Sequence, residues 1–136
     1  MEFDTKIALI VRDDLALWQK LNVTAFLTSG IVGTTDGIMG EVYKDASDAV
    51  YNPLVIQPMI IFAASVDELA RTRRRAADRE VRMAVYIEDM FSTGHDGANR
   101  ETVRQYASGD LPLVGLSMRG EKKLIDKITK GLKLHK

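Results

Sequence analysis

Apolar and polar positions alternate along the chain in blocks that predict buried strands separated by helices. Residues 6–12 hold a short continuous apolar run that ends at Asp13 and Asp14, which is typical of a strand buried on both faces. Residues 15–29 follow with apolar side chains over much of the girth of a helix, so this helix is deeply buried or covered by a partner. Later apolar runs predict three more sheet strands, at residues 59–63, 82–88 and 111–118.

Helices fill most of the intervals between these strands. Ser65 and Glu68 form a capping box, which predicts a helix from there to about residue 79. Two shorter helices are expected, one from an Asn99 cap to residue 107 and one from residue 120 or 121 to about 130. Strands that alternate with helices predict a mainly parallel sheet of four strands with helices on both faces.

The interval after the first helix has a different character. Gly30, Gly33, Gly37 and Gly40 are expected to end the helix and begin a flexible segment. Two apolar pairs, at 42–43 and 50–51, then flank a polar turn at 45–48, which predicts a small β-hairpin inserted between the first two strands of the sheet.

Length and composition exclude several classes of protein. The chain has 136 residues, which predicts a single domain over residues 1–136. It has no cysteine, so disulfides, thiolate zinc sites and a cysteine nucleophile are excluded. Two histidines cannot build a histidine-rich metal centre, and no spaced carboxylate loop is present, so we expect neither a metal nor a cofactor; an all-oxygen metal site stays open. No signal peptide or membrane span is recognisable, so we expect a cytoplasmic protein that does not bind membranes.

The net charge is zero, but the charges are unevenly distributed. Residues 1–70 carry 4 basic and 10 acidic groups, and residues 71–136 carry 15 and 9. Arginines crowd residues 71–82 and lysines crowd the tail, so contacts with nucleic-acid phosphates stay open. Such runs are more often solvated helix faces, and no aromatic residues interleave with the arginines, so a nucleic-acid partner is not favoured.

Three segments resemble type II peptidyl-tRNA hydrolases. Residues 6–15, KIALIVRDDL, resemble their first strand and turn, V-x-R-x-D-L; residues 89–93 occupy the place of their D-A-G-x-T motif; and residues 113–134 resemble their last strand and helix. The chain also resembles an uncharacterised bacterial family, domain of unknown function 2000, around residues 18–27 and 43–51. The resemblance implies a three-layer α/β/α sandwich around a mixed four-stranded sheet of order 2-1-4-3, with the last strand antiparallel.

Five residues are candidates for chemistry. Asp14 and Asp89 each follow a strand, where ligands bind in α/β sheets, and could deprotonate a water together with Lys20. Thr93 could donate to a developing oxyanion, and His95 is a candidate general base on a polar loop. Each also has a purely structural interpretation: Asp14 and Asp89 as caps of a helix and a turn, and His95 as a solvated loop residue.

These candidates lead to three hypotheses of function. The first is a metal-independent hydrolase-like site for a small ester or acyl substrate. The second is a non-catalytic ligand-binding or regulatory module, which is favoured by the absence of the glutamine and histidine that the hydrolases carry in their first helix. The third is peptidyl-tRNA hydrolysis itself. Because the helix at 15–29 has more apolar residues than one face can bury, we also expect a homodimer through that helix.

Overall fold

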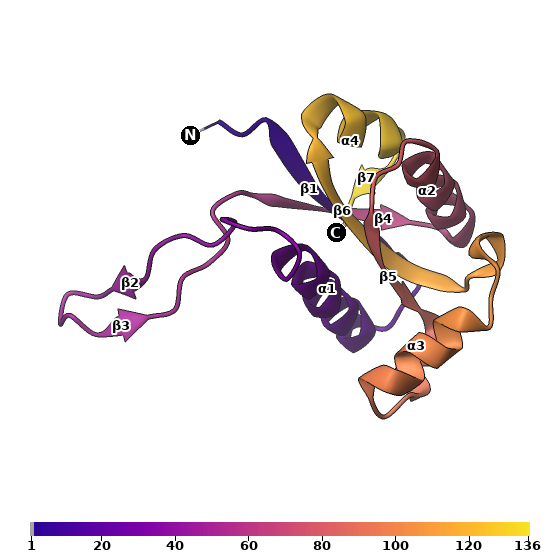
Figure 1. Cartoon of the computed structure of the whole chain (residues 1–136), viewed down its shortest axis with the longest axis horizontal. Helices are drawn as coiled ribbons and strands as arrows, with labels where there is room; N and C mark the ends of the chain where they lie inside the picture. Colours follow the sequence, from indigo (N-terminus) through magenta and orange to yellow (C-terminus); the bar gives the residue numbers. More distant parts are fainter. Residues whose placement is uncertain (1) are drawn as a thin grey trace.

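Five strands form one sheet in the order β5-β6-β1-β4-β7. The computed structural model describes residues 2–136 (Figure 1). The strands are β1 (Thr5–Arg12), β4 (Met59–Ala64), β5 (Met83–Ile87), β6 (Leu113–Glu121) and β7 (Lys133–Leu134). Only β1 and β4 pair in parallel, and the other three pairings are antiparallel. The expectation of a mainly parallel sheet is therefore wrong, because β6 runs opposite to β1 and β5 and lies between them.

The central strand β1 explains the continuous apolar run at the start of the chain. Five consecutive residues, Ile7 to Val11, are at most 1% exposed. Ile7, Leu9 and Val11 pack in one apolar cluster, and Ala8 and Ile10 pack in another on the opposite face. Successive side chains of a strand point to opposite faces, so both faces of β1 must be covered.

Helices cover both faces and complete three layers, as expected. The helix α1 (Leu17–Val32) lies alone on one face, and α2 (Val66–Asp78) and α4 (Lys122–Ile128) lie on the other (Figure 1). The Ser65–Glu68 capping box is present at the start of α2, where the Glu68 carboxylate accepts the Ser65 amide at 3.0 Å. This bond from the Ser65 backbone lowers the pKa of Glu68.

The four central strands have the order β4-β1-β6-β5, which is the 2-1-4-3 order expected, with β6 antiparallel. The fifth strand, β7, was not predicted from the sequence. It pairs through two residues, Lys133 with Ala63 and Leu134 with Phe62, and the His135 amide donates to Ile61. Two residues are too few to show a strand period, so only the tertiary structure reveals this pairing.

Gly30 lies inside α1, and the expectation that it ends the helix is wrong. The helix continues to Val32 and is capped by Gly33. A Cβ at Gly30 would stand 2.6 Å from the Cβ of Ala84 in β5, so the missing side chain allows the helix to approach the sheet. Gly30 therefore serves packing between layers, which its position in the sequence does not show.

The region after β5 also differs from the prediction. A short 3-10 turn, η1 (Glu88–Ser92), leads into α3 (Asp96–Arg104), and a second turn, η2 (Ser108–Asp110), precedes β6. The predicted cap, Asn99, lies within α3; the residue at the cap position is His95, whose Nδ1 accepts the amide hydrogen of Ala98 at 3.1 Å. A histidine cap is uncommon, which is why the sequence pattern favoured the asparagine.

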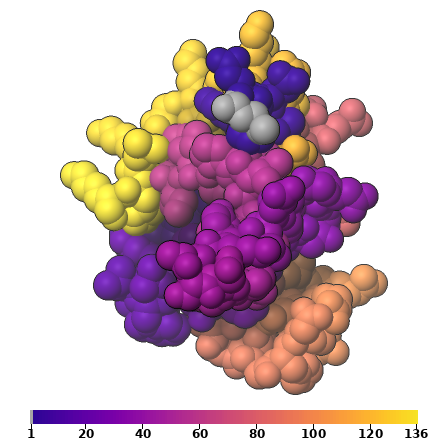
Figure 2. All heavy atoms as spheres, turned by 90° about the vertical axis from the view of Figure 1, so that its left-hand side faces the viewer, coloured from indigo at the N-terminus to yellow at the C-terminus, as the bar shows by residue number. Residues whose placement is uncertain are grey.

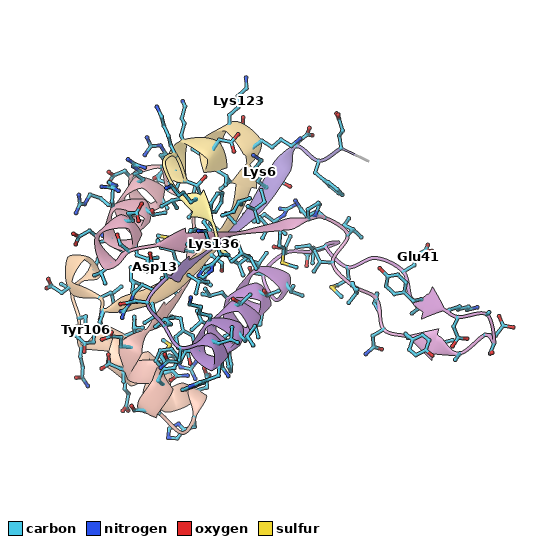
Figure 3. The ribbon with its side chains drawn as sticks, turned by 180° about the vertical axis from the view of Figure 1, so that it is seen from behind. Lys6, Asp13, Glu41, Tyr106, Lys123 and Lys136 are labelled. Carbon is cyan, nitrogen blue, oxygen red and sulfur yellow. The ribbon has the colours of Figure 1, made fainter. Side chains whose placement is uncertain are left out.

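The predicted hairpin is confirmed, and it stands at the end of a projecting arm. Strands β2 (Tyr43–Lys44) and β3 (Val50–Tyr51) pair with each other. Figure 1 shows them extending away from the layers, and Figure 3 shows Glu41 on the same projection from behind. The hairpin therefore contributes nothing to the central sheet.

Candidate functional site

Four aromatic side chains line a cavity of about 400 Å³ between α1, β5 and the start of α3. Trp18 and Phe26 come from α1, Tyr86 from β5 and Phe91 from η1. The ring centroids are 5.9 Å apart for Trp18 and Phe91, 5.3 Å for Phe91 and Tyr86, and 6.0 Å for Tyr86 and Phe26. These tilted and edge-on contacts hold a continuous aromatic wall in place.

Helix periodicity explains how α1 contributes to this wall. Trp18, Asn22 and Phe26 are four residues apart and so lie along one stripe of the helix, beside the stripe of Val23 and Leu27 that packs on the sheet. Trp18 and Phe26 remain 61% and 57% exposed although they line the cavity. The apolar character of α1 thus serves a hollow as well as the core.

Polar groups edge the aromatic wall. Asn22, His95, Asp96 and Asn99 line the cavity, and Asp96 forms an ion pair with Arg100 at 2.6 Å. Burial raises the pKa of the Tyr86 phenol, so this hydroxyl is neutral at pH 7. A neighbouring hollow of about 290 Å³ shares part of the lining, including Phe26, Tyr86 and Asn99. The site joins ring-stacking surface to the amides of Asn22 and Asn99, the His95 ring and the Asp96 carboxylate.

The hydrogen bond that His95 makes determines what its ring can offer. Nδ1 accepts the Ala98 amide hydrogen, so the neutral ring carries its proton on Nε2. In this state His95 is a hydrogen-bond donor at Nε2 and has no free basic nitrogen. A proton on Nδ1 would break the bond from the Ala98 amide. General-base catalysis by Nδ1 would therefore require the ring to leave this conformation.

Thr93 also lines the cavity, but its hydroxyl is already engaged. Its Oγ1 lies 3.1 Å from the carbonyl oxygen of Met90 and in close contact with Oδ1 of Asn99. These bonds fix the turn between η1 and α3 and orient the Asn99 amide so that its NH₂ group is free to donate. The hydroxyl proton is therefore directed at protein acceptors rather than at a bound substrate.

Asp14 lies at the carboxyl end of β1, held by Arg12. The guanidinium donates to Asp14 at 2.7 and 3.3 Å and to Glu88, after β5, at 2.8 Å. The hydrogen bond from Arg12 lowers the pKa of Asp14, and the same bond raises the pKa of Arg12. A carboxylate stabilised in this way is a weaker base than a free aspartate, and through Arg12 it is linked to Glu88 at the end of β5.

Lys20 and Asp89 lie in different surroundings. Lys20 lines a hollow of about 230 Å³ with Leu17, Leu21 and the C-terminal His135, and its charge acts on Asp14 without a direct bond. Asp89 accepts the Tyr106 hydroxyl at 2.9 and 3.2 Å, a contact that raises the pKa of Tyr106 and ties η1 to the chain after α3. The structure thus brings Thr93 and His95 to one cavity, but not Asp14, Lys20 or Asp89.

Sequence reasoning missed several residues of this site. Arg12 lies outside the cavity and bonds Asp14 and Glu88; the signal for the first bond is an arginine two residues before an aspartate. Tyr86, Phe91 and Asn99 line the cavity without any motif that marks them. These residues meet because α1, β5 and the start of α3 lie next to one another in the fold, which no local sequence pattern shows.

Among residues 2–136, no three His, Asp or Glu side chains are grouped so that they could hold a metal ion. No helix in this range has the length and apolar character needed to cross a membrane.

One family model matches nearly the whole chain. The family model described as "Protein of unknown function (DUF2000)" matches residues 5–136. The chain is similar to a solved structure of a protein of unknown function from Agrobacterium tumefaciens, with 51% sequence identity and a TM-score of 0.97, covering 99% of this chain and 100% of that one. No curated protein is a significant match.

Proposed function

The chain belongs to the DUF2000 family, whose description assigns no activity, and we propose from the geometry of its aromatic cavity that it is a small-molecule-binding protein. The observation that carries this proposal is the four-ring wall of Trp18, Phe26, Tyr86 and Phe91 edged by uncharged donors. The ligand is a planar ring that carries a hydrogen-bond acceptor. The volume of about 400 Å³ is within the range of small-molecule pockets, ~300–1,000 Å³.

Each part of the cavity has a place in the binding of such a ligand. The aromatic wall takes the ring by stacking and by excluding water from its faces. His95 Nε2–H and the Asn99 amide donate to a carbonyl or ring nitrogen of the ligand. The exposed flank of Trp18 closes over the ligand, so binding covers apolar surface that is solvated in the free protein.

Trp18 supplies the test, because it is the only tryptophan in the chain. We expect benzamide, which combines a ring with a carbonyl acceptor, to change the Trp18 fluorescence saturably. Phe26→Ala removes one stacking partner from an exposed position and should weaken binding about fivefold to tenfold. Val66→Ala, an exposed apolar residue on α2, is the matched control and should bind normally.

The probe panel includes indole and adenine, so that failure of one ring shape does not decide the matter. The proposal is wrong if none of the three probes gives a saturable signal, or if Phe26→Ala and Val66→Ala bind every probe equally. A change in amide NMR signals confined to α1, η1 and α3 would provide independent support.

A metal-independent hydrolase for small esters or acyl compounds is the second candidate. Thr93 and His95 border the same cavity, which supports it; Asp14, Lys20 and Asp89 would have to act from outside. We expect this candidate to show hydrolysis of a chromogenic nitrophenyl ester that falls at least tenfold, by about 1.4 kcal/mol or more in the barrier, in His95→Ala and Asp89→Ala. His135→Ala is the control for background histidine chemistry. Unchanged turnover in both site variants would exclude these residue roles.

The hydrolase resemblance supports a further proposal about fold and activity. The strand order β4-β1-β6-β5, with β6 antiparallel, is the order that the resemblance to type II peptidyl-tRNA hydrolases implies. If the activity accompanied the fold, the protein would release free tRNA from N-acyl-aminoacyl-tRNA in vitro. No release at high protein concentration would separate this chain from those enzymes and leave the binding function as the better explanation.

A further inference from the structure

Residues 39–56, which we call the arm, project from the molecule between α1 and β4. Every side chain from residue 41 to residue 52 is exposed. Figure 2 views the arm from its tip, and Figure 3 shows Glu41 well outside the layers. Its strands β2 and β3 pair only through Tyr43 with Tyr51 and Lys44 with Val50.

The arm is nevertheless a built structure. Asp45 accepts the amides of Ser47 and Ala49 at 2.8 and 3.0 Å and the Tyr51 hydroxyl at 2.7 Å, which closes the turn at the tip. Near the base, the Gly40 amide donates to Leu54 at 2.9 Å. The two legs are so close there that a Cβ on Gly40 would stand 3.0 Å from the Ile56 side chain. These bonds present the arm as one defined element.

The arm also carries far more apolar surface than it can cover. Five of its large apolar side chains are between 51% and 63% exposed: Val42, Tyr43, Val50, Tyr51 and Leu54. An isolated two-stranded hairpin is at best marginally stable in water, and hairpins of this kind need another surface to pack against. Within residues 2–136, nothing covers the tip of the arm.

The outer face of α1 also has few charges and exposed apolar side chains. Among the sixteen residues of α1 only Lys20 is charged, whereas α2, with thirteen residues, carries seven charged side chains. Leu17 and Leu21 are 72% and 65% exposed, on the flank of α1 that borders the Lys20 hollow rather than the aromatic cavity. A helix exposed to solvent with so few charges is expected to be covered by a partner.

We propose that the arm of one copy docks on the Leu17–Leu21 flank of α1 in a second copy of this chain, reciprocally. Every copy carries both surfaces, so a two-fold exchange covers two arms and two helix flanks at once and leaves neither unpartnered. The exchange would bury seven large apolar side chains per copy that are each more than half exposed, five on the arm and two on α1. A stable interface buries ~800 Å² per partner. This assembly is independent of the ligand proposed for the aromatic cavity.

Solution mass tests whether the assembly forms. Light scattering coupled to gel filtration should give at least twice the 15.1 kDa of one chain at tens of micromolar protein. The double variant Val50→Asp, Leu54→Asp should be a monomer with an unchanged circular dichroism spectrum, because both side chains are exposed within their own chain. Val66→Asp, which adds a charge at an exposed valine of α2, should retain the larger mass. A monomeric native chain, or an arm variant of undiminished mass, would overturn the proposal.

The absence of cysteine allows the contact itself to be mapped. Val50→Cys and Leu21→Cys are made in separate chains. The two chains are mixed until their subunits have exchanged, and are then treated with a short bismaleimide cross-linker. We expect cross-linked pairs that contain one chain of each kind, identified by mass spectrometry of the joined peptides. Val66→Cys mixed with Val50→Cys should give at least tenfold less product. A native dimer in which arm and α1 cysteines do not cross-link would refute the docking mode even though a dimer exists.

Discussion

At the scale of single residues, Arg12 connects two strands that are distant in the chain. Its guanidinium joins Asp14, after β1, to Glu88, after β5, and its side chain is only 13% exposed. Planar guanidinium geometry suits this double role, which a lysine would not reproduce. Asp14, expected as a catalytic base, is thus also one partner in a network that joins the ends of β1 and β5.

We predict a pH-dependent contribution of Asp14 to stability. Its pKa lies below the ordinary 3.8 because Arg12 donates to the folded-state carboxylate. A lowered folded-state pKa gives stability that is present above the unfolded-state pKa and is lost as the pH falls through the folded-state value. Because Asp14 is largely exposed, Asp14→Asn should lower the free energy of unfolding by no more than about 1 kcal/mol at pH 7.

The measurement is urea unfolding of both proteins between pH 7 and pH 2. The difference between native chain and variant should be constant well above pH 4, about the ordinary aspartate value, and shrink below it. Asp36→Asn, at an exposed carboxylate beyond the end of α1, is the matched control. A difference that does not change with pH would mean that Asp14 acts through something other than its charge.

At the scale of elements, α1 has three roles on three stripes. Val23, Leu27 and Ile31 bury themselves on the sheet, Trp18, Asn22 and Phe26 line the aromatic cavity, and Leu17 and Leu21 face the Lys20 hollow. This division explains why the sequence shows no single apolar face. A pattern that predicts only burial cannot separate core, cavity lining and exposed flank, because all three use apolar side chains.

The packing of α1 on β5 predicts an unusual response to a helix-favouring substitution. Gly30→Ala should gain up to about 1 kcal/mol in helix propensity. It should nevertheless destabilise the protein by about 1–3 kcal/mol net, because the new Cβ would stand 2.6 Å from that of Ala84. Thermal and urea unfolding measure the change.

Ala84→Gly should restore much of the lost stability in the double variant, since it removes the atom that clashes. Gly109→Ala, where a Cβ would meet nothing within 4 Å, is the control for alanine in place of glycine. Additive effects of Gly30→Ala and Ala84→Gly in the double-mutant cycle would show that the two positions are not in contact.

At the scale of the whole molecule, β7 forms one edge of the sheet. The short strand β7 covers part of β4, whose sequence, MIIFAA, is entirely apolar. Exposed apolar edge strands invite pairing with other chains. The last residues of the chain therefore protect the sheet as well as extend it.

Removal of residues 133–136 should expose β4 and promote association. We expect the shortened chain to scatter light and gain β-sheet signal on incubation at concentrations where the full chain remains clear. A chain that lacks only Lys136 is the control, because it keeps both β7 residues and the His135 bond to Ile61. A shortened chain as stable to incubation as the full one would show that β7 is dispensable.

Local patterns predicted most elements of the fold and little of the site. The capping box of Ser65 and Glu68, the buried run of β1 and the hairpin turn all depend on interactions within a few residues, and they were predicted correctly. The packing role of Gly30, the strand β7 and the His95 cap were not predicted. Gly30 and β7 depend on neighbours distant in the chain, and at the start of α3 the sequence offers two possible caps, His95 and Asn99.

By itself, the sequence determined the alternation of strands and helices, since apolar periodicity and capping are encoded over short stretches. Only the tertiary structure decided which side chains meet. It brought His95 and Thr93 to an aromatic cavity with Tyr86, and it paired Asp14 with Arg12. The physical reason is that hydrogen bonds and ring contacts form over a few ångströms between residues distant in the chain, so the sheet order chooses the partners.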